Sequence, residues 1–329
     1  MQRLKIGFIG CGGIASAHAE RLSLLDSVKL TAFSDVQVEK AKGLAVRFGG
    51  RAYPSWREML EREQLDAVFV CLPPFAHEDE IEVAAEKGIH IYIEKPIALD
   101  MAKAWSMVRA IEKYGVKSQV GYQMRFSPAA ERAKAIIDSG AVGRIGMVTG
   151  SYWCRFIRTD WWIDRSKSGG QIVEQATHLY DALRWLCGDA RSVYAFMDRL
   201  FWNVEGMSIE DASGVLIRFK SNAIGLVSST TGAVPDQWWF KWSIVGLDAT
   251  LVSDNPDEVT VYYTSDKPVR VETFRERGRD PMLMSEKNFI DAILKDQPTR
   301  TPIIEGAKTL ELTLAAVKSA DTGKPVDIE

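Results

Sequence analysis

The chain has 329 residues, of which 46% are apolar and 26% charged, so it is long enough for about two soluble domains with buried cores. Its net charge is −3 and its Lys and Arg residues form no basic run, which argues against a nucleic-acid partner. Cys11, Cys71, Cys154 and Cys187 are far apart and form no Cys-x-x-Cys or Cys/His cluster, so we predict neither a metal site nor a disulfide framework.

The first residues have the layout of an export signal without its composition. Charged residues at 1–5 precede an apolar run at 6–14 and small residues at 15–17, but four of the nine residues in the apolar run are glycine. Such a run is poor for export, and no uncharged stretch approaches the ~20 residues that span a bilayer. We therefore predict a cytoplasmic protein that has no membrane partner.

Residues 1–123 alternate short apolar runs with amphipathic segments. The runs are rich in β-forming residues, and we expect strands at 3–10, 28–35, 66–73, 90–96 and 117–123. Between them, helical segments that include 36–49, 75–88 and 100–115 carry charges on one face. Strands that alternate with helices predict βαβ units, and hence an α/β fold with a parallel sheet covered on both faces.

Beyond residue 123 the regular alternation of expected strands and helices ends. We expect helices at 127–140, within 166–189, at 286–296 and at 306–323, and a strand at 144–154. Between 190 and 275, apolar and polar residues alternate in several of a series of expected strands at 192–202, 213–220, 223–232, 238–247, 258–264 and 269–275. Alternation of this kind predicts an antiparallel sheet with one buried face.

A glycine-rich turn follows the first expected strand. Gly10, Gly12 and Ala15 have the spacing Gly-x-Gly-x-x-Ala at the point where that strand meets a helix. In dinucleotide-binding proteins the first glycine makes the tight turn, the second lets the backbone approach the pyrophosphate, and the N–H groups at the helix start hold the anion. The sequence predicts such a site; a glycine-rich turn without a ligand is the alternative.

Asp35 ends the second expected strand, 20 residues beyond Ala15. A carboxylate at this place accepts hydrogen bonds from the adenosine ribose hydroxyls of NAD and repels the 2′-phosphate of NADP. We therefore predict NAD as the cofactor, with NADP less suitable. Asp35 can also cap a helix that begins at Val36, and the two roles are compatible.

Two further strand ends lie at the edge where an open α/β sheet binds its ligands. Leu72 and Pro73 close one strand, and the ring of His77 just beyond either contacts the cofactor or caps the next helix. Glu94 and Lys95 close another, where the proline that follows holds Lys95 in extended backbone, so that its ammonium projects from the strand end. An exposed loop lysine is the alternative.

These motifs resemble the Gfo/Idh/MocA family, the glucose-fructose oxidoreductase and inositol dehydrogenase group. The matching stretches, in family order, are GFIGCGGIA, Asp35, CLPPFAH, IEKPIAL, VGYQMRF and GGQIVEQATHLYDALRWLCGD. The resemblance implies a Rossmann domain at 1–123 and a substrate-binding α+β domain at 124–329, whose large, open-faced, mostly antiparallel sheet forms the interface of a homodimer or homotetramer. It also implies hydride transfer between a nicotinamide and a hydroxyl carbon of a sugar, sugar derivative or cyclitol.

The resemblance further implies which residues form the site. Lys95 and His178 would be the acid/base pair, and Glu174 would be a third catalytic residue where the family commonly has aspartate. The cofactor site would comprise Gly10, Gly12, Gly13, Ile14, Asp35, Leu72, Pro73, His77, Glu94, Lys95 and Gln123. The substrate site would comprise Lys95, Arg125, Trp161, Trp162, Glu174 and His178.

The helix expected within 166–189 would place Glu174 and His178 on one face, because they are four residues apart. Oxidation of an alcohol needs a base for the hydroxyl proton, and histidine has the unperturbed pKa nearest neutrality. Glu174 would orient the ring or contact another hydroxyl. A buried histidine satisfied by a neighbour is the alternative, and Asp181 is expected to serve helix packing or ring orientation.

Eight of the ten tryptophans lie beyond residue 150. Trp161 and Trp162, in the stretch RTDWWIDRS at 158–166, either stack on a sugar or pack in the protein. Trp238, Trp239 and Trp242 are expected on a sheet face or at an oligomer contact.

Three functions are compatible with these motifs. The first is an NAD-dependent sugar or cyclitol dehydrogenase. The second is a redox-neutral glycosidase or epimerase that oxidises a ring carbon and later returns the hydride, and net formation of NADH separates it from the first. The third is a non-catalytic sugar or dinucleotide sensor, which predicts loss of the lysine or the histidine; both are present.

Overall fold

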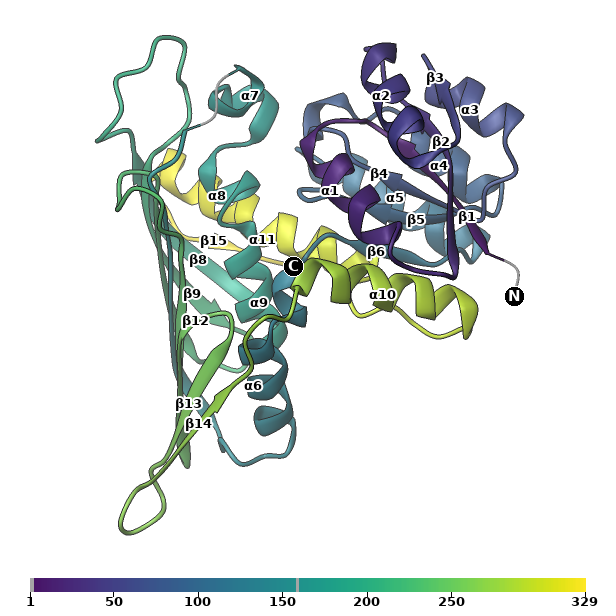
Figure 1. Ribbon diagram of the computed structural model, residues 1–329. Coiled ribbons are helices and arrows are strands. Elements are labelled where there is room, and N and C mark those ends of the chain that lie inside the picture. The colour runs from purple at the N-terminus through teal and green to yellow at the C-terminus, as the bar shows by residue number, and fades with distance from the viewer. Residues whose placement is uncertain (1–2, 158–159) are drawn as a thin grey trace. The chain divides into compact units, whose positions relative to one another are not determined.

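The computed structural model describes residues 3–157 and 160–329, and its strands form two separate sheets (Figure 1). The chain divides into two compact units. The first is Met1–Gly121 with Met282–Ala307, and the second is Tyr122–Pro281 with Lys308–Glu329. The boundary expected between residues 123 and 124 assigned 282–307 to the second domain, whereas the structure packs this segment into the first unit.

The first unit is built on a six-stranded sheet in the order β3-β2-β1-β4-β5-β6, and every neighbouring pair is parallel, as predicted. Its strands are β1 (Leu4–Ile9), β2 (Val28–Ser34), β3 (Arg51–Tyr53), β4 (Ala67–Val70), β5 (His90–Ile93) and β6 (Ser118–Val120). Its helices are α1 (Gly13–Leu22), α2 (Val38–Phe48), α3 (Trp56–Arg62), η1 (Pro74–Ala76), α4 (Glu80–Glu86), α5 (Met101–Tyr114) and α10 (Pro281–Leu294). The strand order reverses between β1 and β4, which is where open α/β sheets bind ligands.

Aromatic side chains on neighbouring strands explain why α10 joins this unit. Phe33, Phe8, Phe69 and Tyr92 lie side by side on β2, β1, β4 and β5, with ring centroids 4.5–5.4 Å apart from one strand to the next. Phe289 of α10 meets Phe69 edge-on at 5.8 Å and is fully buried. Such pairs each contribute about 0.5–1.5 kcal/mol beyond the area that they bury, so the row provides a ready apolar surface for α10.

The second unit is built on a nine-stranded sheet in the order β14-β13-β12-β11-β7-β10-β9-β8-β15. Its strands are β7 (Ile145–Trp153), β8 (Ala190–Asp198), β9 (Ala212–Phe219), β10 (Ile224–Thr230), β11 (Trp239–Gly246), β12 (Ala249–Asn255), β13 (Glu258–Tyr263), β14 (Arg270–Arg275) and β15 (Val326–Asp327). All neighbouring pairs are antiparallel except β7 with β10. The mostly antiparallel sheet is confirmed, but β12 was not expected.

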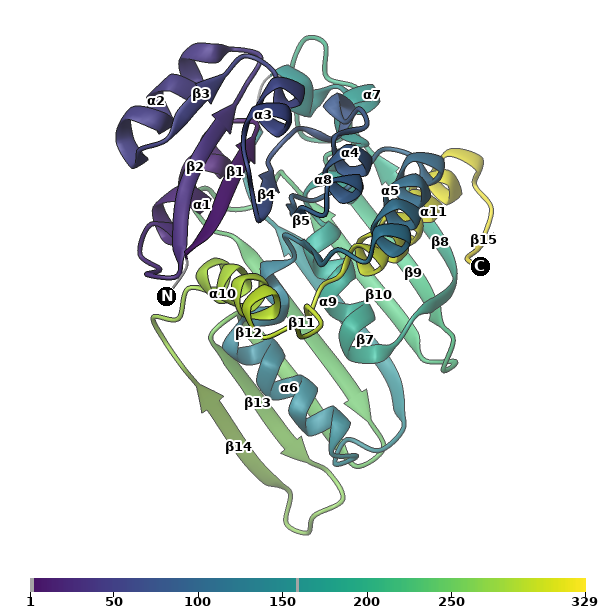
Figure 2. The same ribbon diagram turned by 90° about the vertical axis from the view of Figure 1, so that its right-hand side faces the viewer.

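Helices cover one face of this sheet (Figures 1 and 2). The helical elements are η2 (Gln123–Phe126), α6 (Pro128–Asp138), η3 (Asp160–Ile163), α7 (Arg165–Ser168), α8 (Gln171–Glu174), α9 (Thr177–Cys187) and α11 (Ile303–Thr322). Val215, Ile217 and Phe219 of β9 are buried in the core that α6, α9 and α11 share with the sheet, whereas Leu216 between them is 48% exposed. The alternation confirms a sheet with one buried face, and no described helix lies on the other face.

In the part of the chain that the structure describes, no helix is long and apolar enough to cross a membrane. The four cysteines are free and buried.

Candidate active site

The glycine turn between β1 and α1 fits a dinucleotide. Gly10 has φ +85°, and a Cβ there would lie 2.6 Å from the Cys71 carbonyl oxygen, so only glycine is accommodated. Gly12 precedes α1 and Gly13 begins it, and a Cβ on either would meet no atom within 4 Å. No side chain caps this helix, so its first N–H groups and the space beside the two glycines suit a pyrophosphate.

Asp35 is tied to this turn. Its Oδ2 accepts the Cys11 N–H at 2.8 Å, and its Oδ1 accepts the Gln37 N–H at 2.8 Å. Helix α2 begins at Val38 rather than at Val36, so Asp35 does not cap it. Each carboxylate oxygen has a second lone pair, which leaves acceptor capacity for ribose hydroxyls.

The residues after β4 lie against the same turn. The side chain of Leu72 is within 3.1 Å of where a Cβ of Gly10 would be, and Pro73 precedes η1. The ring of His77 is buried, and its Nδ1 is 2.5 Å from Oε1 of Glu80, at the start of α4. Burial raises the pKa of Glu80, but the hydrogen bond and charge of His77 together with backbone N–H donors outweigh it, and the pKa lies below its usual value. The ring of His77 thus contacts the Glu80 side chain and does not cap α4, and its Nε2 is a buried atom without a partner among the described residues.

Lys95 follows directly after Glu94 at the end of β5, and its peptide bond to Pro96 is cis. The Glu94 side chain turns inward: its Oε1 is 3.0 Å from Nε2 of His18, and its Oε2 accepts the Lys95 N–H at 3.3 Å. Nδ1 of His18 is 2.6 Å from Oε1 of Glu286 in α10. We expected Glu94 in the cofactor site. In the structure, its carboxylate forms a hydrogen bond with the ring of His18.

The helix expected to carry Glu174 and His178 is two helices. Glu174 is the last residue of α8, and His178 is the second residue of α9, with a turn at 175–176 between them. The expectation that both lie on one face of a single helix is therefore wrong. Two consecutive glycines with positive φ, Gly169 and Gly170, lie between α7 and α8.

A buried carboxylate fixes α8 from outside. Oε1 of Glu210 accepts the Ile172 N–H at 2.7 Å, and a Cβ on Gly170 would come within 2.4 Å of Oε2 of Glu210. Burial raises the pKa of Glu210 to about 7. At the other end of α8, Oε2 of Glu174 accepts the Trp162 indole N–H at 2.6 Å.

His178 lies in a buried setting. Its residue is 8% exposed, and its ring meets the ring of Tyr122 edge-on, with centroids 6.1 Å apart. The Tyr122 hydroxyl is 3.0 Å from Oγ1 of Thr177, the residue that begins α9. Tyr122 thus holds the first turn of the helix and one side of the histidine ring.

Arg125, which we expected in the substrate site, pairs with a buried carboxylate. It is 1% exposed, and its Nε and Nη2 donate to the two carboxylate oxygens of Asp181 at 2.8 and 2.6 Å. Oγ1 of Thr309 in α11 is 3.2 Å from the same carboxylate. Because the buried guanidinium is engaged by Asp181, Arg125 anchors α9, and Asp181 serves helix packing as expected.

Some of the tryptophans are packed inside the protein, and others are partly or largely exposed. Trp162 is 2% exposed and packs with Ile163, Met207 and Ile209, which leaves its faces covered; Trp161 is partly buried beside this cluster. Arg158 and Thr159 of the same stretch lie outside the described residues. Trp242 is in the sheet core, Trp239 stacks on Trp153 at 5.1 Å across β11 and β7, and Trp238 is 56% exposed.

The structure therefore brings together Gly10, Gly12, Gly13, Asp35 and Leu72 in the first unit, with Ile14 as the second residue of α1. Gln123, expected at the cofactor, begins η2 in the second unit. Sequence reasoning missed His18, Glu210, Glu286 and Tyr122. A histidine in the helix after a glycine turn is the one local signal that pointed to any of them.

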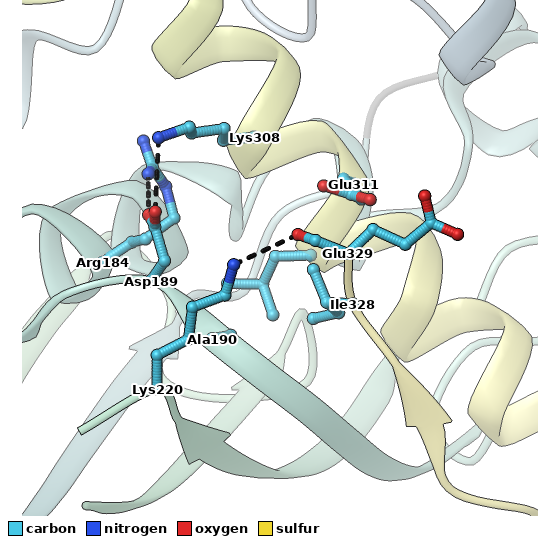
Figure 3. Close-up of a pocket in the computed structure, with 9 residues that line it drawn as sticks. Arg184, Asp189, Ala190, Lys220, Lys308, Glu311, Ile328 and Glu329 are labelled. Atoms are coloured by element: carbon cyan, nitrogen blue, oxygen red, sulfur yellow. Dashed lines mark hydrogen bonds and ion pairs between the residues drawn. The ribbon is translucent and has the colours of Figure 1, made fainter. Parts of the chain in front are cut away.

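A pocket drawn in Figure 3 is a separate feature of the second unit. Arg184 and Lys308 both pair with Asp189 at its rim, and Nζ of Lys220 donates to the Glu329 carbonyl oxygen at 3.2 Å. Its volume of about 100 Å³ is well below that of usual ligand pockets, and none of the expected site residues lines it.

Two family models match the chain. Residues 4–122 match the oxidoreductase family with an NAD-binding Rossmann fold, and residues 130–252 match the Gfo/Idh/MocA C-terminal domain. The fold and the glycine turn define a dinucleotide-binding oxidoreductase. The chain belongs to the Gfo/Idh/MocA family, which confirms the resemblance seen in the sequence, and its cofactor is NAD.

Curated relatives and a solved structure are similar to this chain over most or all of its length. Myo-inositol 2-dehydrogenase of Thermotoga maritima is 28% identical, with 99% of each chain covered. Levoglucosan dehydrogenase of Pseudarthrobacter phenanthrenivorans is 27% identical over 82% of this chain and 79% of the relative. A solved levoglucosan dehydrogenase, in complex with NADH and levoglucosan, superposes with a TM-score of 0.92 at 23% identity, covering 99% of this chain and 100% of the other, and supports the fold.

Replacement of Gly12 by alanine tests the glycine turn. Its φ of −78° suits alanine and the added Cβ meets no protein atom, so the free energy of unfolding should change by less than ~0.5 kcal/mol. The same methyl group would occupy the space that a pyrophosphate needs, so we expect the NAD dissociation constant to rise by about tenfold or more.

The matched control is Gly43→Ala in α2, where a Cβ also meets nothing within 4 Å. It should leave NAD binding unchanged and stabilise the protein by ~0.5–1 kcal/mol. Calorimetric titration with NAD and urea unfolding measure both quantities. Unaltered NAD binding in Gly12→Ala would show that the turn does not hold the pyrophosphate.

Proposed function

We propose that the chain is an NAD-dependent dehydrogenase that oxidises a secondary hydroxyl of a cyclitol, a sugar or a sugar derivative. The observation that carries this proposal is the glycine turn tied to Asp35, within a family whose curated relatives include myo-inositol, scyllo-inositol and levoglucosan dehydrogenases. These relatives are named for net oxidation, which supports a dehydrogenase over a redox-neutral enzyme or a sensor.

In this proposal, Lys95 and His178 are the acid/base pair of the reaction. NAD, when bound, supplies the hydride acceptor. His178 takes the hydroxyl proton, because an imidazole is a base near neutral pH. Lys95 donates a hydrogen bond to the same oxygen and stabilises the negative charge that develops there. Lys95 belongs to the first unit of the chain and His178 to the second.

Glu174 has a supporting role in this proposal. Its carboxylate is held by the indole of Trp162, which is a buried donor. A carboxylate fixed in this way can accept a hydrogen bond from a second substrate hydroxyl, or from the His178 ring, without reorganising. Trp161 is proposed to contact the substrate. For Arg125 the role is to anchor α9, through Asp181.

The proposed activity is tested with purified protein, NAD and a panel of cyclitols, aldoses and glycosides, followed by the absorbance of reduced nicotinamide. Wild type should form NADH, and Lys95→Ala and His178→Ala should each lower kcat by ~10²–10⁴-fold, because His178 is the base for the hydroxyl proton and Lys95 stabilises the charge on the oxygen. Lys113→Ala, at an unburied lysine on α5, is the control and should keep full activity.

No net NADH with any member of the panel, in a protein that binds NAD, would contradict the dehydrogenase. Release of a glycone or epimerisation in the same mixtures would then establish the redox-neutral alternative.

The choice between NAD and NADP is tested at Asp35. In Asp35→Asn the negative charge is lost while a carbonyl oxygen remains to accept one of the two backbone N–H groups. We expect the ratio of kcat/KM for NAD over NADP to fall by about tenfold, equivalent to ~1.4 kcal/mol, because repulsion of the 2′-phosphate is removed. Asp26→Asn, an equal charge change at an exposed position of the same unit, should leave the ratio unaltered. An unchanged ratio in Asp35→Asn would remove Asp35 from cofactor selection.

We also propose that the uncovered face of the nine-stranded sheet joins copies of the chain in a homodimer or homotetramer. This face exposes apolar side chains on adjacent strands, among them Met147, Leu216, Ile224, Leu226 and Val245. Contiguous apolar surface of this kind is typical of interfaces.

The four free, buried cysteines support a reducing compartment, and we propose the cytoplasm as the location.

Sedimentation measures the proposed assembly. Wild type should be a dimer or tetramer at micromolar concentration, and Leu226→Glu, which puts a charge in the middle of the face, should be a folded monomer. Leu24→Glu changes an exposed leucine of the first unit in the same way and should keep the wild-type assembly. A monomeric wild type would refute the interface.

A further inference from the structure

The first unit holds a buried ionic triad that the proposed chemistry does not use. His18 in α1 is fully buried, with Nδ1 2.6 Å from Oε1 of Glu286 and Nε2 3.0 Å from Oε1 of Glu94. An ionised carboxylate only accepts hydrogen bonds, so a ring that faces a carboxylate at both nitrogens must carry a proton on each. The geometry is therefore that of an imidazolium between two carboxylates.

The surroundings favour that charged form. Burial lowers the pKa of His18, but the hydrogen bonds with Glu286 and Glu94 raise it more, and it reaches about 9. Tyr92 of β5 and Cys71 after β4 have pKa values raised by burial, and burial raises the pKa of Cys11 to about 12. These three groups stay neutral near pH 7 and add no charge beside the triad.

The triad reaches Lys95 through one carboxylate. Oε1 of Glu94 is held by His18, and its Oε2 accepts the Lys95 N–H at 3.3 Å. Gly121, after β6, lies directly against this group, because a Cβ there would come within 2.4 Å of Oε1 of Glu94. The carboxylate is thus confined between an imidazolium, the backbone of Lys95 and a glycine whose missing side chain makes the room.

The same ring joins three elements from distant parts of the sequence. His18 belongs to the helix that begins at the glycine turn, Glu94 directly follows β5, and Glu286 lies in α10. Removal of one partner from a buried charge cluster is strongly destabilising, because the remaining charges lose their counter-charge. The His18 ring is therefore placed to transmit its own protonation state to the strand end that carries Lys95.

We infer that His18 is a positioning residue of the proposed reaction: the imidazolium grips Glu94, Glu94 fixes the backbone at Lys95, and loss of the ring proton releases that backbone. The inference rests on the proposed function for its effect on catalysis. The effect on the Lys95 backbone is independent of the substrate, and it is measured separately.

The stability effect has a defined sign. The pKa of His18 in the folded chain, about 9, lies above the unfolded value of 6.5. The stabilisation is therefore complete below pH 6.5 and is lost as the pH rises through 9. The folding equilibrium constant of wild type should fall by up to about tenfold per pH unit in this window, and His18→Gln should show no such fall.

Hydrogen–deuterium exchange tests the grip on Lys95 without any substrate. Peptides that contain the Lys95 amide should exchange faster in His18→Gln than in wild type when both are compared at pH 7. His90→Gln is the matched control, since His90 is in the same unit, accepts the Lys117 N–H and takes no part in the triad. Equal exchange at Lys95 in wild type and His18→Gln would overturn the inference, whatever the activity of the protein.

Kinetics then separate positioning from general stability. With the substrate found above, His18→Gln should lower kcat by ~10–100-fold at pH 7 with little change in KM for NAD, because a misplaced Lys95 affects the chemical step. Wild type should lose kcat above pH 9, and the variant should lack that inflection. A wild-type kcat and pH profile in a variant that is merely less stable would overturn the inference.

A spectroscopic readout covers the case in which His18→Gln does not fold. In wild type labelled with ¹⁵N-histidine, the His18 ring should show two protonated nitrogens at pH 7 and titrate near pH 9. A neutral ring at pH 7 would overturn the inference. An imidazolium with a protected Lys95 amide, in a protein that oxidises no polyol, would support the grip and refute the proposed function instead.

Discussion

Buried carboxylates need a counter-charge, and in the first unit this requirement is met by one histidine. Glu94 and Glu286 are both buried, and two unpaired carboxylates at such depth would cost several kcal/mol each. The ring of His18 lies between them and engages one with each nitrogen. The glycine-turn helix, the end of β5 and a helix from near the C-terminus are consequently held to one another by charge as well as by the aromatic row.

The second unit also contains a buried ion pair, in which one partner lies on α9, the helix that carries the candidate base His178. Arg125 and Asp181 are buried and joined by two hydrogen bonds, and Thr309 of α11 completes the set. Breaking such a pair at one partner costs about 3–5 kcal/mol, so α9 has little freedom to rotate. With Tyr122 against the ring of His178, the histidine is presented from a rigid helix, which suits a base that must meet a substrate hydroxyl in a narrow range of geometries.

Local patterns predicted most of the fold, and the missed features are those that depend on distant residues. The strand and helix alternation, the glycine spacing and the position of Asp35 are readable because each is a short-range property. His18 and Glu286 are 268 residues apart, and no periodicity links them. Strand β12, with the sequence ATLVSDN, contains several polar residues, and α10 joins the first unit through Phe289. Glu210, which accepts the Ile172 N–H at the start of α8, is 38 residues away in the sequence.

Glu174 occupies a position where the family resemblance led us to expect aspartate. Its longer side chain reaches the indole N–H of Trp162 at 2.6 Å. Trp162 is itself buried with Ile163, Met207 and Ile209, so the extra methylene is used to fasten the aromatic segment to α8. Because α8 is anchored by Glu210 at its other end, the carboxylate is fixed from both directions. A group held so firmly is suited to orient a hydroxyl or an imidazole, and less suited to exchange a proton, which is consistent with the proposal that Lys95 and His178 are the acid/base pair.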